Sequence, residues 1–298
     1  MTATDRGTAA VPAVAAARRR RGRRATQRSL AGSIVLWVLL GLGAVFILLP
    51  LVWMLSTAFK QPDDAFAVPP HWLSKPTGAN FSELLTGEFR KYVLNSLLVS
   101  VVTTVIALAF GIPAGYAFAR TRIRGGKFIQ AWFVLAYVIP PVIFIIPLYI
   151  IYQHAHLLDS YTGLVLAYET GILPFTVWLM RAYMSEVPRE LDEAAWIDGC
   201  SKLGALWRVV LPTVLPGITT VGLMVGLSAW GEYFGAVILT GPKTQTAPVA
   251  VNSYVGLLSS DWSKLAAAGV VVIVPALLAT VFVQRGFARG LSFGAVKQ

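Results

Sequence analysis

Three acidic side chains stand close together in a short polar segment that separates two long apolar runs. Glu190, Asp192 and Glu193 follow Pro188. Proline suits the first turn of a helix because it has no N–H to leave unpaired, and the helix dipole favours negative charge at that end. A helix this short and this charged cannot cross a bilayer, so we expect it to lie in water or against protein. Its carboxylates can then bind basic groups on a partner.

Small side chains accompany these acidic residues. Ala194 and Ala195 leave one flank of the expected helix almost flat, beside the larger Trp196. A flat flank suits insertion into a cleft on another protein, where Glu193 and Asp198 would meet basic groups. We therefore interpret the segment as a docking helix, and an ordinary amphipathic linker helix is the alternative interpretation.

The same segment carries its own stop and start signals. Gly199 follows the expected helix and can end it, and Ser201 can cap the helix that comes next. A helix, a tight turn and a second helix are therefore expected between the two apolar runs.

Two further carboxylates fall inside apolar runs. Glu169 and Glu232 are the only acidic side chains within the spans predicted below. A buried carboxylate in a membrane costs several kcal/mol unless it is paired or hydrated, so each is a candidate for the solute path. Trp230, Glu232 and Tyr233 could offer a polar solute hydrogen-bond acceptors and an aromatic platform. The alternative for both carboxylates is structural, and for Glu232 it is a hydrogen bond to a neighbouring helix.

The sequence lacks the residue patterns of an enzyme. Gly125-Gly126-Lys127 is followed by Phe128 and has no upstream glycine at the spacing of a phosphate-binding loop, so we do not expect the chain to hydrolyse ATP. The three histidines have no acidic companions at metal-ligand spacing. Cys200 is the single cysteine, which excludes an intrachain disulfide. We predict no catalytic residue, no metal site and no cofactor bound by this chain.

The composition is that of a membrane protein. Of the 298 residues, 56% are hydrophobic and 13% are charged, and the mean hydropathy is +0.67. A helix needs about 20 apolar residues to cross a hydrocarbon core of about 30 Å, and uncharged runs of that length recur. We predict an all-α polytopic membrane protein with six transmembrane helices. These span about residues 32–57, 92–118, 128–152, 162–181, 211–239 and 265–284.

Basic residues are distributed unequally between the two faces of this arrangement. The arginine-rich residues 1–31 and most other Lys and Arg fall on the side that holds both termini. Positive charge favours the cytoplasmic side, so we expect cytoplasmic N- and C-termini. The formal net charge of +11 then indicates orientation in the lipid bilayer and not a nucleic-acid partner. A cleavable signal peptide fits less well, because residues 29–59 are uncharged and far exceed an apolar core of about 7 to 15 residues.

The chain is then expected to divide into four parts. Residues 1–31 form a disordered basic tail, 32–91 the first transmembrane helix with an external loop, 92–284 a transmembrane domain whose cytoplasmic loop covers about 183–210, and 285–298 a C-terminal tail. Several spans contain proline, which survives in a membrane only where neighbours or water satisfy the freed carbonyls. These prolines favour a cavity or moving parts, with a merely kinked bundle as the alternative.

Several short motifs follow one another from residue 92 onward. They are Asn95–Leu97, Gly115–Arg120, Ile146–Tyr149, Asp159–Leu164, Val187–Gly199, Trp230–Tyr233 and Gly290–Lys297. In this order they resemble the maltose-type carbohydrate uptake permeases of the binding-protein-dependent ABC transporters, specifically the smaller six-helix membrane subunit. Within them, Glu193–Gly199 resembles the EAA loop, the cytoplasmic motif that docks onto a separate ATPase. The resemblance covers about two thirds of the chain.

The resemblance implies a type I ABC importer transmembrane domain in a multi-pass bacterial cell membrane protein. It implies a heterodimer with a second permease subunit, two ATPase subunits that hold ATP and Mg, and an external solute-binding protein that delivers a sugar. The implied coupling helix contains Glu190, Glu193, Ala194, Ala195, Asp198 and Gly199. The external segment 240–263, with Asn252 and Tyr254, would contact the binding protein. The chain departs from the family pattern at Gly231 and Tyr233, where Asn and Phe are usual, and at Cys200.

We therefore predict a permease subunit that translocates a sugar or related polyol. An importer of glycerol phosphate or peptide is a near alternative, since the docking loop reports the ATPase and not the cargo. A second alternative is an ion-coupled secondary transporter that uses Glu169 and Glu232 as proton carriers. A third alternative is a membrane anchor or sensor.

Overall fold

The computed structural model describes residues 30–65, 67, 75–256 and 261–294. The described residues form helices and no β-strand, which confirms the all-α prediction for this part of the chain. Of the predicted basic tail only residues 30 and 31 are described, and the last three residues of the motif Gly290–Lys297 also lie outside the described ranges. The chain divides into two compact units, residues 1–53 and 54–298.

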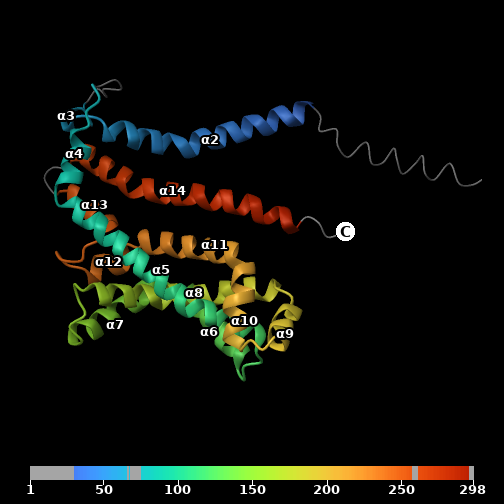
Figure 1. Cartoon of the computed structure of the whole chain (residues 1–298). Helices are drawn as coiled ribbons and strands as arrows, with labels where there is room; N and C mark the ends of the chain where they lie inside the picture. The colour runs from blue at the N-terminus through green and yellow to red at the C-terminus, as the bar shows by residue number, and fades with distance from the viewer. Residues whose placement is uncertain (1–29, 66, 68–74, 257–260, 295–298) are drawn as a thin grey trace, which may run out of the picture. The chain divides into compact units, whose positions relative to one another are not determined.

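Long helices alternate with short ones along the chain (Figure 1). The helix α2 (Leu30–Ala58) crosses the boundary between the two units. The long helices of the second unit are α5 (Phe89–Arg120), α6 (Gly126–Val138), α7 (Pro141–His154), α8 (Tyr161–Glu186), α11 (Leu211–Trp230) and α14 (Trp262–Gly294). The short ones are α3 (Pro62–Ala65), α4 (Ala79–Thr86), α9 (Arg189–Ile197), α10 (Lys202–Ala205), the π-helix η1 (Leu206–Val210), α12 (Phe234–Leu239), α13 (Ala247–Val251) and the 3₁₀ helix η2 (Asn252–Tyr254).

Five of the described helical segments are long and apolar enough to cross a membrane, or six if a bent pair counts as one span. The five are Gly32–Ala58, Phe89–Arg120, Tyr161–Glu186, Lys202–Trp230 and Trp262–Val281. The bent pair joins Gly126–Val138 to Val142–His154 at an angle of 92°. The predicted span 128–152 is therefore a broken pair of helices.

The break between α6 and α7 has a local cause. Ile139 and Pro140 have extended ψ angles of 126° and 129°. A residue that precedes proline avoids the helical conformation, and consecutive prolines at 140 and 141 also remove two N–H donors. The chain therefore leaves the helix at this point and starts a new one in another direction.

The predicted span 211–239 also differs from the structure. Helix α11 ends at Trp230, and a separate helix α12 begins at Phe234. Glu232 and Tyr233 therefore lie in a break between two helices and not inside a continuous span. Gly231 stands at the C-cap of α11 with ψ near 2°, where a glycine costs little.

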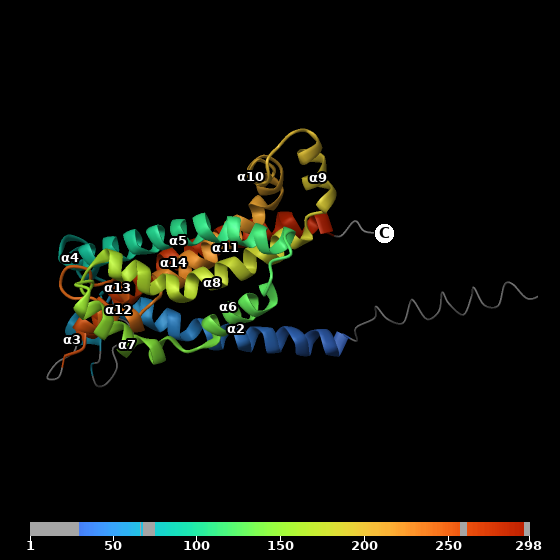
Figure 2. The ribbon, with the colours of Figure 1, turned by 90° about the horizontal axis from the view of Figure 1, so that it is seen from below.

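The centre of the second unit is formed by α5, α8 and α11, which run side by side in both views (Figures 1 and 2). Two glycines of α5 let α8 approach closely. A Cβ atom at Gly111 would lie 2.5 Å from Thr176 Cγ2, and one at Gly115 would lie 2.7 Å from Met180 Cβ. Small residues commonly permit such contacts between membrane helices. Both pairs advance in the same chain direction, so α5 and α8 are parallel.

Short helices lie at the two ends of this central bundle. Figure 2 shows α9 and α10 at one end and α12 and α13 at the other. At the first end, Met184 of α8, Leu206 of η1 and Val210 of η1 belong to the main buried cluster. This packing supports the loop that the sequence predicts as the docking helix.

Candidate functional site

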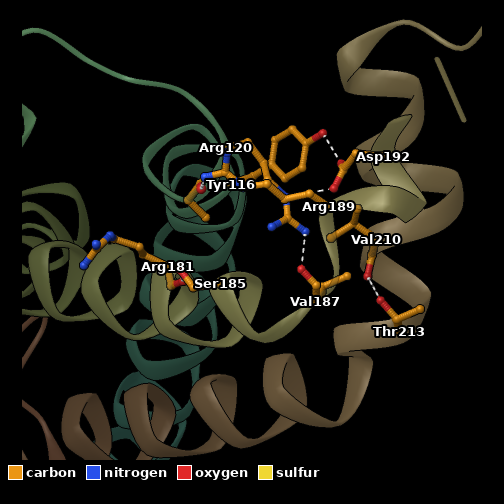
Figure 3. A network of polar contacts seen from close by, with 10 residues as sticks. Tyr116, Arg120, Arg181, Ser185, Val187, Arg189, Asp192, Val210 and Thr213 are labelled. Atoms are coloured by element: carbon orange, nitrogen blue, oxygen red, sulfur yellow. Dashed lines mark hydrogen bonds and ion pairs between the residues drawn. The ribbon is translucent and has the colours of Figure 1, made fainter. Parts of the chain in front are cut away.

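The side chain of Asp192 ties the predicted docking helix to the transmembrane bundle. Asp192 lies on α9 and is only 1% exposed. Its Oδ2 atom lies 2.8 Å from Nε of Arg120, the last residue of α5, and this arginine side chain is 5% exposed. The hydroxyl of Tyr116, one turn earlier on α5, donates to Asp192 Oδ1 at 2.6 Å. The buried carboxylate thus has an ion pair on one oxygen and a hydrogen bond on the other (Figure 3).

Two backbone contacts complete this connection. Arg120 Nη2 donates to the carbonyl of Val187 at 2.9 Å, just before α9 begins. In the opposite direction, Arg189 Nη2 donates to the carbonyl of Ala119 at 3.4 Å. Figure 3 shows Tyr116 and Arg120 pointing toward Asp192. Because α5 and α9 are joined at several atoms, a displacement of α9 acts directly on the end of a membrane helix.

The opposite face of α9 is exposed. Asp192 and Ala195, three residues apart and therefore on one face, are buried, and Ala195 is 5% exposed. The other predicted coupling residues are exposed, namely Glu190, Glu193, Ala194, Asp198 and Gly199. The prediction of a flat flank built from both alanines therefore needs correction. Ala194 stands on the exposed side, whereas Ala195 packs inward.

Large apolar side chains border these acidic residues. Trp196 is 40% exposed and Ile197 86%, and in the next two helical segments Leu203 is 61% and Trp207 55% exposed. Clusters of exposed apolar side chains beside charged ones are typical of protein interaction surfaces. We call the exposed residues Glu190, Glu193, Ala194, Trp196, Ile197, Leu203 and Trp207 the docking face.

The turn after α9 forms as the sequence predicts. Gly199 has a positive φ of 86° and donates its N–H to Trp196 O at 3.0 Å. A glycine adopts this left-handed conformation without steric cost. The Ser201 hydroxyl accepts from Gly204 N–H at 3.1 Å, so it caps α10. The docking face is therefore held by local caps as well as by the buried ion pair.

A cavity of about 450 Å³ lies at the bend between α6 and α7, against α8, α11 and α12. Its lining is mostly apolar and includes aromatic rings and one carboxylate. The lining residues include Tyr137, Phe144, Tyr168, Ser228 and Glu232. Glu232, which the sequence makes a candidate for the solute path, lines this cavity.

The Glu232 carboxylate also has a structural role. Oε1 accepts from Gly235 N–H at 2.9 Å, and Oε2 accepts from Ala236 N–H at 3.1 Å. These are N–H groups in the first turn of α12, which have no partner within the helix. The hydrogen-bonding alternative thus matches the geometry, although the bonds go to the helix that follows Glu232 in the chain.

The aromatic residues next to Glu232 point elsewhere. Trp230 is 8% exposed, and its Nε1 donates to the carbonyl of Val272 on α14 at 2.9 Å. Trp230 does not line the cavity and instead connects α11 to α14. The hydroxyl of Tyr233 accepts from Asn252 Nδ2, so the break after α11 touches the external segment. The structure therefore brings Tyr233 and Asn252 together but separates Trp230 from the cavity.

Glu169 lies in the packed bundle. It is 9% exposed, does not line the cavity, and neither carboxylate oxygen has a hydrogen-bond partner among the described residues. Asn95 on α5 accepts a hydrogen bond from Tyr161 on α8, and Gly111 faces Thr176. By this register, Glu169 lies level with Thr103 and Thr104 of α5.

An aspartate that sequence reasoning did not single out organises the external segment. Asp159 Oδ1 accepts from the N–H groups of Gly241 and Thr244, both at 2.9 Å, and from Thr244 Oγ1 at 2.7 Å. Its Oδ2 accepts from Lys243 N–H at 3.2 Å. Burial raises the pKa of Asp159, but the four hydrogen bonds outweigh it and hold the pKa below its ordinary value. The sequence signals were the motif Asp159–Leu164, which this residue opens, and a turn-forming Gly241-Pro242-Lys243 run.

The predicted contact residues for a binding protein differ in exposure. Asn252 is exposed, whereas Tyr254 is partly buried and its ring lies 6.1 Å from that of Phe89 between centroids. Tyr254 therefore helps to attach the external segment to the start of α5. Among the described residues, no group of three or more His, Cys, Asp or Glu side chains could hold a metal ion.

Comparisons with known proteins agree on one family. Residues 107–292 match the family model described as "Binding-protein-dependent transport system inner membrane component". The chain is 34% identical over 279 residues to the diacetylchitobiose uptake system permease protein DasC of Streptomyces coelicolor. The aligned region covers 91% of this chain and 99% of that relative. It is 31% identical over 261 residues to the trehalose transport system permease protein SugB of Mycobacterium tuberculosis, at 85% and 93% coverage.

The fold has a counterpart among solved structures. A chain of a bacterial ABC transporter involved in the import of the acidic polysaccharide alginate superposes with a TM-score of 0.74. The match covers 87% of this chain and 98% of that one, at 24% sequence identity. This likeness concerns the arrangement of the helices.

Proposed function

Because this chain belongs to the family of binding-protein-dependent transport system inner membrane components, we propose that its docking face is the surface through which an ATPase drives transport. The family consists of multi-pass membrane permeases and not of enzymes. The chain is accordingly a membrane-spanning permease subunit of an ATP-driven importer. The resemblance to maltose-type permeases is confirmed at the level of this family.

One observation carries the docking proposal. The helix α9 is fixed to the bundle through buried Asp192, while it presents Glu193, Trp196 and Ile197 outward. A helix with one anchored face and one exposed face can transmit a push from a partner as a rigid body. The exposed carboxylates would meet basic groups in a cleft of the ATPase, and the apolar side chains would fill it.

The remaining partners follow from this assignment. We infer two ATPase subunits that bind ATP and Mg, a second permease subunit that completes the pathway, and an external solute-binding protein. The docking face would then lie in the cytoplasm together with both termini, in agreement with the excess of Lys and Arg on that side. The segment with Asn252, at the opposite end of α5 and α8, would face the binding protein (Figure 2).

A carbohydrate or related polyol is the proposed cargo. Two relatives carry names that refer to diacetylchitobiose and trehalose, and the chain aligns with nearly their whole lengths. The cavity supports this proposal, since the exposed ring of Tyr137 can stack on a sugar ring and Ser228 can hydrogen-bond to its hydroxyls.

Ion-coupled transport has less support. That hypothesis needs Glu169 and Glu232 to carry protons, but the Glu232 carboxylate already accepts two hydrogen bonds from backbone N–H groups. Both carboxylate oxygens are therefore engaged at the start of α12. The ion-coupled mechanism also leaves the exposed docking face without a role.

Purification of the tagged chain from its native host in mild detergent tests the proposal. We expect an ATPase, a second permease and a solute-binding protein to co-purify, and mass spectrometry of the ligand released from the binding protein to identify the cargo. Uptake into proteoliposomes should require internal ATP and should persist when a protonophore collapses the proton gradient. Uptake that needs the gradient and no ATPase would instead support the ion-coupled mechanism.

A further inference from the structure

A second pocket, of about 630 Å³, lies beside the docking helix at the ends of α5 and α8. Its lining is mostly polar and includes four arginines, two glutamates and a serine. These arginines are Arg120, Arg122, Arg181 and Arg189, and we call this site the arginine pocket. The pocket shares only Glu190 with the docking face and no residue with the solute cavity.

Two of the four arginines have acceptors within the chain. Arg120 pairs with Asp192 and donates to Val187 O, and Arg189 donates to Ala119 O. The other two, Arg122 and Arg181, have no hydrogen bond or ion pair with any described residue. For Arg181 this matters most, because its Nε atom is buried and has no partner among the described residues. A buried N–H without an acceptor is rare, and a guanidinium group carries five donors.

The direction of Arg181 separates it from the coupling network. Figure 3 shows its guanidinium group pointing away from the pair that Arg120 forms with Asp192. The Ser185 hydroxyl, one turn further along α8, donates to the carbonyl of Arg181 and not to a side chain. The donors of Arg181 are therefore available to an acceptor that comes from outside the chain.

The charge of the site favours an anion. Glu186 and Glu190 also line the pocket, but both are exposed and neither pairs with an arginine among the described residues. The planar guanidinium group matches phosphate oxygens in a bidentate arrangement.

The depth of the site indicates where such an anion comes from. Helices α5 and α8 are parallel and both are long enough to cross a membrane, and the pocket lies where both end, at Arg120 and Glu186. The ends of spanning helices lie at the level of the lipid headgroups. Basic pockets between spanning helices on the cytoplasmic side are suited to anionic headgroups.

We infer that the arginine pocket binds a phosphate group, with Arg181 and Arg122 as its direct ligands. The phosphodiester of an anionic phospholipid headgroup and free inorganic phosphate share this chemistry. The inference rests on the proposed function in one respect only. The proposed orientation in the membrane is what assigns the pocket to the cytoplasmic leaflet. Occupancy beside α9 would stabilise the end of α8 that leads directly into the docking helix.

Thermal unfolding of the purified complex in mild detergent tests the inference. Three probes are added separately: dioctanoyl phosphatidylglycerol, dioctanoyl phosphatidylcholine and inorganic phosphate. We expect phosphatidylglycerol to raise the unfolding temperature and phosphatidylcholine to leave it nearly unchanged. In Arg181→Gln and Arg122→Gln the apparent affinity should fall by about tenfold or more, as expected for loss of a charge-assisted hydrogen bond. Arg124→Gln removes an exposed arginine that does not line the pocket and should retain full affinity.

The outcomes separate the sources and the proposals. If inorganic phosphate alone produces the same shift with the same variant sensitivity, the ligand is free phosphate. If the wild-type complex shows no preference for phosphatidylglycerol, or if both pocket variants retain it, the inference is wrong. Arg181→Lys keeps the charge and guards against a folding defect, since it should retain part of the affinity that Arg181→Gln loses. The amount of ATPase that co-purifies is measured in the same preparations. If the proposed function is wrong, the ATPase will be absent from the wild-type complex, whatever the lipid result.

Discussion

Arg120 and Asp192 form a buried ion pair of 2.8 Å between the last residue of a membrane helix and the inner face of the predicted coupling helix. The contact joins the helix that would dock onto the ATPase to α5, one of the three central helices of the bundle.

Asp192→Asn should weaken coupling and stability together. Removal of one charge leaves Arg120 buried without its counter-ion, which typically costs about 3 to 5 kcal/mol. We expect a clear fall in the unfolding temperature and loss of ATP-driven uptake in proteoliposomes. Glu193→Gln, which changes an exposed carboxylate on the same helix, is the control for stability and should unfold near the wild-type temperature. Equal stability of the two variants would remove the structural role of the pair.

Glu193→Lys should prevent recruitment of the ATPase. The substitution places a cation on the docking face, where the proposed partner offers basic groups, and like charges in an interface are costly. The helices of the bundle should still insert, because Glu193 is exposed. The amount of ATPase that co-purifies measures the effect. Glu88→Lys alters an exposed glutamate at the other end of α5 and should leave recruitment intact, whereas normal recruitment by Glu193→Lys would contradict the docking role.

Asp159→Asn should destabilise the protein in a pH-dependent way. The carboxylate accepts four hydrogen bonds from Gly241, Lys243 and Thr244, and an amide cannot satisfy all of these donors, at an expected cost of about 1 to 3 kcal/mol. Because the pKa of Asp159 is lowered in the folded state, its contribution is fully present above the ordinary aspartate pKa of about 3.9. That contribution disappears as the pH falls through the lowered pKa.

The measurement for Asp159 is thermal unfolding across a pH series. The gap between wild type and Asp159→Asn should be largest near neutral pH and should narrow below about pH 4. Asp63→Asn changes an exposed aspartate of α3 and should show no such gap. A gap that stays constant over the whole series would mean that the carboxylate charge is not what holds the external segment.

Gly115→Ala should disrupt the packing of α5 against α8. The added methyl group would lie 2.7 Å from Met180 Cβ and 2.9 Å from the backbone nitrogen of Arg181, so the helices must separate. Overpacking of this kind costs about 1 to 3 kcal/mol. Gly171→Ala is the matched control, since a methyl group added there would meet no atom within 4 Å and alanine favours a helix by up to about 1 kcal/mol. If both variants unfold at the same temperature, close approach at Gly115 is not required.

Local signals in the sequence were sufficient for the main features of the fold. Long apolar runs predict spanning helices because a helix of about 20 apolar residues matches the thickness of the hydrocarbon core, wherever it occurs in the chain. The turn at Gly199 and the cap at Ser201 were predictable for the same reason, since a positive φ and a capping hydroxyl act within a few residues. The breaks at Pro140 and Gly231 also have local causes, but hydropathy alone continues across them.

The roles of individual side chains depended on contacts that the sequence does not contain. Asp192 and Glu193 are adjacent acidic residues, yet one is buried against Arg120 and the other is exposed, because the position of α5 decides which face of α9 is covered. Trp230 bonds to α14, and Asp159 bonds to a segment beyond α11, for the same reason. The sequence by itself determined the all-helical fold, the docking turn and the family, although two of its predicted spans are broken in the structure. The tertiary structure alone decided which charges are paired, because the partner of a buried charge comes from whichever helix packs against it.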